Sequence, residues 1–86
     1  MIFSVIWMME PLLQLQQIEA ESDVPEIVRE AASFMEYALR RIPHELGESR
    51  RPKERLWYAD VLGIYYRVDT DNSRVIVIDV AKAMRK

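Results

Sequence analysis

The sequence lacks cysteine altogether, so its 86 residues can form neither a disulfide nor a thiolate metal site. Histidine occurs once, at His44, and no His, Asp and Glu cluster has the spacing of a metal site. A Gly-rich phosphate loop and a GxSxG nucleophile elbow are absent as well. These absences predict a protein without a metal or other cofactor, suited to a reducing compartment such as the cytoplasm.

The sequence also lacks an apolar run long enough to cross a membrane. Its most apolar segment, MIFSVIWMMEPLLQL at residues 1–15, carries Glu10 and Pro11 within it. A membrane helix needs about 18 uninterrupted apolar residues. The segment has neither a basic start nor a small-residue cleavage site, so it does not have the form of a signal peptide. We therefore predict an untargeted cytoplasmic protein.

Length and composition predict one globular domain over residues 1–86, because half of the residues are hydrophobic and 30% are charged. The net charge of −2 is unevenly distributed. Residues 1–36 hold seven acidic side chains and one basic one, whereas residues 37–86 hold eleven basic and seven acidic ones. Such asymmetry predicts two differently charged surfaces, of which the basic one could meet a polyanion.

The first half of the chain has the pattern of one strand and two helices. Residues 2–7 (IFSVIW) are β-branched and aromatic, which predicts a buried strand. A helix is expected from Pro11 to about Ala20. Asp23 and Glu26 match a capping box before a second helix. The apolar stripe of this helix is expected to comprise Ile27, Ala31, Phe34, Met35, Ala38 and Ile42.

The second half predicts a loop followed by three strands. The loop spans residues 44–52, and the strands residues 55–61, 64–69 and 74–80. The last strand is apolar enough to lie inside the sheet. The fold class is therefore α+β in the order β-α-α-β-β-β, with two helices packed on one face of a small, mostly antiparallel sheet.

A cationic stretch, LGESRRPKERLWY at residues 46–58, stands out in this acidic chain. Alternation along an extended chain predicts that Arg51, Lys53 and Arg55 share one face. Interleaved aromatic residues could stack bases while the cations hold phosphates, as RNA recognition requires. The alternative is a solvated charged face beside core aromatics, with His44 as an incidental surface residue. The aromatic residues concerned are Trp57, Tyr58, Tyr65 and Tyr66.

Several short strings follow one another along nearly the whole chain. They are Trp7 near the end of the first strand, LGESRR after the second helix, KERL at the opening of the second strand, YYRVD in the third strand and VIVIDVAK in the last strand. Their order and spacing resemble those in members of the RelE/ParE superfamily of bacterial toxins. The resemblance implies a toxin bound by a cognate antitoxin. RelE-like members cut ribosome-bound mRNA, whereas ParE-like members block DNA gyrase.

The implied cutting mechanism is metal-independent: a base takes the 2′-OH proton, cations stabilise the phosphorane and an acid protonates the leaving 5′ oxygen. The residues predicted to be catalytic are Lys53, Arg55, Arg67 and Lys82, of which Lys53, Arg55 and Lys82 match positions of the family. The residues predicted to bind RNA are Arg50, Arg51, Tyr65 and Arg85. Lys53 would be the general base or phosphate anchor, and Arg55 would stabilise charge. Tyr65 would take the role of the tyrosine or histidine that many of these nucleases carry at the C-terminus.

Parts of the nuclease pattern are missing from the sequence. The arginine that active members carry early in the third strand has no counterpart at Gly63 to Tyr65, and Ala83 replaces another one. Three interpretations stay open. The chain could be a ribosome-dependent mRNA endoribonuclease, a ParE-like or non-catalytic member that acts by binding protein, or a degenerate member whose basic loop only keeps it soluble.

Overall fold

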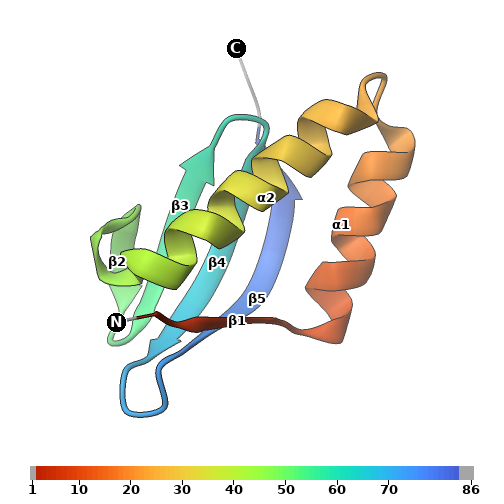
Figure 1. The fold of residues 1–86 in the computed structure, drawn as a ribbon. Coiled ribbons are helices and arrows are strands. Elements are labelled where there is room, and N and C mark those ends of the chain that lie inside the picture. Colours follow the sequence, from red (N-terminus) through yellow and green to blue (C-terminus); the bar gives the residue numbers. More distant parts are fainter. Residues whose placement is uncertain (1, 84–86) are drawn as a thin grey trace.

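The computed structural model describes residues 2–83, which form a five-stranded sheet with two helices packed on one face (Figure 1). This arrangement confirms the predicted α+β class. Within the described residues, no helix is long and apolar enough to cross a membrane. The prediction for Arg85 falls outside the described residues.

The sheet has one strand more than the sequence predicts. Its strands are β1 (Ser4–Trp7), β2 (Glu48–Arg51), β3 (Glu54–Ala59), β4 (Leu62–Asp69) and β5 (Arg74–Lys82), in the spatial order β1-β5-β4-β3-β2. β1 pairs with β5 in parallel, and all other pairs are antiparallel. β2 lies in the segment 44–52 that was expected to be a loop. Every side chain of β2 is exposed, so no apolar alternation marks it in the sequence.

The first strand lies at the edge of the sheet and is not the buried strand predicted for residues 2–7. Its side chains are alternately exposed and half-buried, because only β5 pairs with it. Phe3, just before it, is buried, and its N–H donates to the carbonyl of Arg40 at 2.8 Å. Trp7 Nε1 donates to Glu36 Oε1 at 3.2 Å. These two bonds fasten the edge strand to the second helix.

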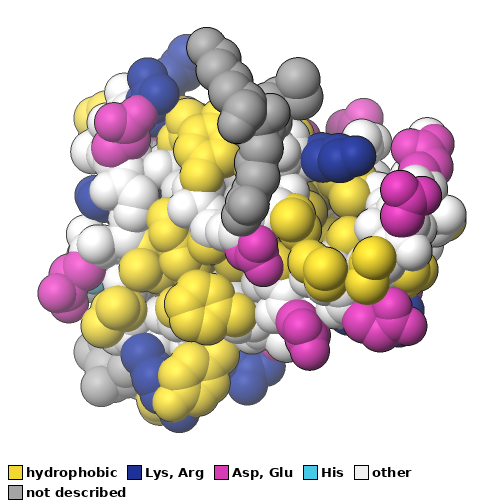
Figure 2. Space-filling model, turned by 90° about the horizontal axis from the view of Figure 1, so that it is seen from above, with side chains coloured by type: hydrophobic (Ala, Val, Ile, Leu, Met, Phe, Trp, Pro, Cys, Tyr) yellow, Lys and Arg dark blue, Asp and Glu magenta, His cyan; other side chains and the backbone are white. Residues whose placement is uncertain are grey.

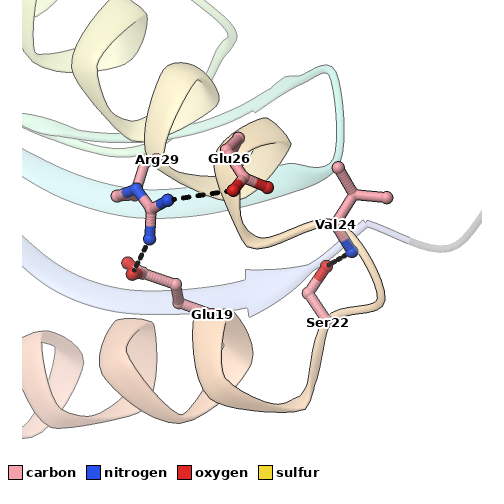
Figure 3. A network of polar contacts seen from close by, with 5 residues as sticks. All are labelled: Glu19, Ser22, Val24, Glu26 and Arg29. Carbon is pink, nitrogen blue, oxygen red and sulfur yellow. Dashed lines mark hydrogen bonds and ion pairs between the residues drawn. The ribbon is translucent and has the colours of Figure 1, made fainter.

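The two helices are α1 (Met9–Glu21) and α2 (Pro25–Arg41), and α2 is followed by the short 3-10 turn η1 (Pro43–Glu45). The predicted capping box is wrong. Pro25 occupies the first helical position, so Val24 is the N-cap, and it has no side-chain cap. Ser22 Oγ instead accepts from Val24 N at 3.2 Å, and Glu26 lies 3.5 Å from Arg29 (Figure 3).

An ion pair joins the two helices of this hairpin. Arg29 Nη1 of α2 lies 2.6 Å from Glu19 Oε1 of α1 (Figure 3). The pair is partly exposed, so it contributes little to stability, at most about 1 kcal/mol. The hairpin is held mainly by the apolar side chains that both helices place on the sheet.

The core lies between the helices and the sheet. Ile64, Tyr66 and Val68 of β4 face it. The prediction of the apolar stripe of α2 is only partly correct. The buried side chains of α2 are Val28, Ala31, Met35, Ala38 and Leu39, whereas Ile27, Phe34 and Ile42 are exposed. In α2, two overlapping sets of apolar residues both recur at spacings of three and four. Packing against β4 and α1 determines which of the two sets is buried.

A buried tyrosine fixes the segment that leads from α2 to β2. The Tyr66 hydroxyl donates to the carbonyls of Pro43 at 2.8 Å and Leu46 at 3.2 Å. Burial raises the pKa of Tyr66 to about 12, so it stays protonated as the donor at neutral pH. The position of β2 and its cations is thereby tied to the core.

Candidate functional site

The register of the sheet divides the predicted cations between its two faces. Partners in an antiparallel pair share a face. Arg55 lies opposite buried Tyr66 and so faces the helices, whereas Arg51 lies opposite Glu54 on the open, helix-free face. Lys53 lies in the turn between β2 and β3, with a φ of 70°. The prediction that Arg51, Lys53 and Arg55 share one face is therefore wrong, because a turn interrupts the alternation between them.

The open face brings three of the predicted residues together at the β2 end. Arg51 of β2 and Arg67 of β4 both pair with Glu54 of β3, one from each neighbouring strand. The Tyr65 hydroxyl donates to Glu54 Oε1 at 2.5 Å. That hydrogen bond and desolvation raise the pKa of Tyr65, so it holds its proton at neutral pH. Arg50, also predicted to bind RNA, forms an ion pair with Glu48 at 2.6 Å.

Lys82 lies at the opposite end of the sheet. It pairs with Leu62 at the start of β4, whereas the Lys53 carbonyl accepts from Val68 near the end of that strand. At a rise of about 3.3 Å per residue, the two lysines are separated by about 20 Å along β4. Lys82 lines a cavity of about 220 Å³ beside the helical hairpin, whose apolar lining includes Ile18 and Val61. The four predicted catalytic residues therefore do not converge.

The centre of the open face holds a shallow pocket of about 130 Å³ without a basic side chain in its lining. Its lining residues are Leu56, Tyr58, Gly63, Ile64, Tyr65, Asp79, Val80 and Ala81. The Tyr58 ring covers Gly63: a Cβ at that glycine would lie 2.4 Å from the ring. Aromatic and aliphatic side chains with one carboxylate are poorly suited to stabilising the negative charge of a phosphorane.

A second small pocket, of about 90 Å³, lies on the helix side at the β2 end. It is lined by His44, Ser49, Lys53, Glu54, Arg55 and Val68. Arg55 is held there by the loop, because its Nε donates to Leu46 O at 2.7 Å and its Nη2 to Gly47 O at 3.3 Å. Sequence reasoning missed His44 and Ser49 as neighbours of the lysine. The pairing of β2 with β3 brings Ser49 there, and the path of the chain after α2 brings His44 there; the sequence pattern predicts neither.

Aromatic side chains are exposed along one flank of α2. Phe34 is 57% exposed and its ring centroid lies 6.1 Å from that of Trp57 on β3. Tyr37 is also exposed, and the Arg41 guanidinium lies 3.9 Å from its ring centroid. Figure 2 shows hydrophobic side chains exposed across this side of the molecule, with basic and acidic side chains interspersed around them. We call Phe34, Tyr37, Arg41 and Trp57 the α2 flank patch.

Within residues 2–83, no group of His, Asp and Glu could hold a metal ion. Together, these observations define a helical hairpin on a mixed sheet, with scattered cations and an aromatic flank. Clustered aromatic residues and an arginine are typical of protein-binding surfaces.

The architecture is a RelE/ParE-like fold, which confirms the resemblance at the level of the fold. A chain of the toxin–antitoxin complex RelBE2 from Mycobacterium tuberculosis has a TM-score of 0.77 and 18% identity, covering 96% of this chain and 100% of that one. A chain of the chromosomal ParDE TA system from P. aeruginosa has a TM-score of 0.73 and 14% identity, covering 96% and 98%. No family model and no curated protein matches the sequence.

Proposed function

We propose that this chain is the toxin of a toxin–antitoxin module and that it acts by binding a protein target. The fold it shares with chains of two toxin–antitoxin systems supports the first part. The second part rests on one observation: the pocket at the centre of the open face has no basic side chain in its lining. A nuclease of the implied kind needs several cations around one phosphate, and Lys53 and Lys82 lie at opposite ends of the sheet.

The antitoxin is proposed to cover the α2 flank patch. Exposed aromatic rings with an arginine among them favour an amphipathic segment with acidic residues, since apolar contacts and charge pairing then act together. Arg41 places positive charge within the patch, over the Tyr37 ring. Covering Phe34 and Tyr37 would remove apolar surface that is costly to leave in water.

An mRNA endoribonuclease acting on ribosome-bound mRNA is the second candidate. One observation favours it: Arg51, Arg67 and Tyr65 gather around Glu54 on the open face. In this alternative, the arginines would hold the phosphate and Tyr65, which keeps its proton, would serve as the acid.

Growth of bacterial cells tests the proposal. Expression of this chain alone is expected to arrest growth, and co-expression of the antitoxin encoded beside it is expected to restore growth. Arg67→Gln removes a cation from the open face and is expected to leave the arrest unchanged at equal protein level. Loss of the arrest in this variant would favour the endoribonuclease instead. No arrest by the folded wild-type chain would contradict a toxin of either kind.

A further inference from the structure

A groove runs between the start of α1 and the second half of β5, which lie side by side (Figure 1). Two cavities form it, of about 380 Å³ and about 370 Å³, and Glu10 and Ile78 line both of them. Each cavity has the size of a typical ligand pocket. The other lining residues are Met8, Met9, Pro11, Gln14 and Asp79. We call this the α1–β5 groove, and it shares no residue with the α2 flank patch.

A β-bulge in β5 turns two consecutive side chains toward this groove. Ile78 is left out of the pairing between β4 and β5, because the register shifts there by one residue. As a result, Ile78 and Asp79 are both exposed, although their neighbours Val77 and Val80 are both buried. β1 ends opposite Val77, so it does not cover Ile78 either. Bulges are common where a strand must re-aim a side chain next to a functional site.

The end of the groove nearest β1 is apolar. Met8 and Met9 lie where β1 passes into α1, and both side chains are more than half exposed. Ile78 is exposed beside them. Methionine side chains are flexible and polarisable, so they adapt to different apolar partners, and exposed ones are frequent on protein-binding surfaces. This end of the groove therefore suits a large apolar side chain of a protein partner.

The other end of the groove is acidic. Glu10 and Asp79 line one cavity together, and within the described residues neither forms an ion pair. Asp79 Oδ1 accepts from Val80 N at 2.9 Å, which orients this carboxylate before a partner arrives. The described lining contains no Lys or Arg. Two carboxylates that line one cavity attract a cation and disfavour a symmetric dimer, which would bring the same acidic groups of two copies together.

We propose that the α1–β5 groove docks the protein target, through a segment that carries a Lys or Arg close to a large apolar side chain. This inference rests on the proposed function, in which the toxin acts by binding a protein. The apolar side chain would pack on Met9 and Ile78, and the cation would form charge-assisted hydrogen bonds with Glu10 and Asp79. The opposite charges would also speed the encounter of the two proteins.

The double variant Glu10→Gln/Asp79→Asn removes both charges of the groove and keeps the size of both side chains. In Asp79→Asn the side-chain oxygen can still accept from Val80 N, so the bulge is expected to persist. The expression level needed for half-maximal growth arrest is expected to rise about tenfold or more, because two charge-assisted contacts to the target are lost. Growth curves over a range of inducer concentrations, with the protein quantified by immunoblot, measure this level.

The matched control is Glu30→Gln/Asp71→Asn, which removes the same two charges from exposed positions outside the groove. It is expected to arrest growth at the wild-type expression level. Calorimetric titration with the antitoxin checks the fold of both double variants, and the affinity for the antitoxin is expected to stay unchanged in both.

Arrest at the wild-type level in the groove variant, or an equal loss in both double variants, would overturn the docking site and leave the toxin assignment standing. Weaker antitoxin binding in the groove variant alone would assign the groove to the antitoxin and so overturn the inference too. No arrest by the wild-type chain would instead contradict the proposed function, on which the inference rests.

Discussion

Gly47→Ala is expected to destabilise the fold by about 3 kcal/mol or more, a large part of the stability of a small domain. The φ of Gly47 is 60°, which an alanine adopts only at a cost. Its new Cβ would lie 2.1 Å from the Leu56 carbonyl oxygen and 2.7 Å from Trp57 Cβ. Backbone atoms of β3 would have to move, and the pairing of β2 would be lost with them. Urea denaturation measures the change.

Gly63→Ala is the matched control. The added Cβ would also be too close to another atom, at 2.4 Å, but that atom belongs to the Tyr58 ring. Tyr58 is 63% exposed, so its side chain can rotate away. The expected cost is about 1 kcal/mol or less. If Gly63→Ala proved as destabilising as Gly47→Ala, the account of how β2 is held against β3 would be wrong.

Phe34→Ala is expected to weaken binding of the antitoxin by about thirtyfold or more, as removal of an aromatic hot spot does. Phe34 is 57% exposed, so the free energy of unfolding should change by no more than about 0.5 kcal/mol. Calorimetric titration of the antitoxin into the variant gives the affinity, and thermal denaturation gives the stability.

Met9→Ala is the control for that experiment. Met9 is 73% exposed at the start of α1, outside the α2 flank patch. It is expected to bind the antitoxin like the wild type. Unchanged affinity in Phe34→Ala, or the same loss in both variants, would mean that the antitoxin covers another surface.

The sequence predicts the fold well wherever a segment has one dry face. In β4, Ile64, Tyr66 and Val68 alternate with more polar residues, and this period identifies both the strand and its buried side. The sequence pattern does not predict β2, because backbone pairing with β3, and not burial of its side chains, makes it a strand. In α2 the apolar residues fit two neighbouring stripes, so only the packed helix distinguishes buried Leu39 from exposed Phe34.

The site is less predictable than the fold, because a turn of two residues decides on which face each cation lies. Pro52 and Lys53 form that turn, so Arg51 and Arg55 end up on opposite faces of the sheet. The gathering of His44 near Lys53 depends on the path of the loop that Tyr66 fixes. Long-range register of this kind is not encoded in the local pattern of charges.

The most direct test of the central claim is the integrity of mRNA in a cell-free translation reaction, mapped by primer extension with and without this protein. A toxin that binds a protein target leaves the mRNA intact, and this is the result we predict for the folded chain. Cleavage within ribosome-occupied codons, lost when Arg51 and Arg67 are replaced by glutamine, would contradict the account and establish the open face as a nuclease site.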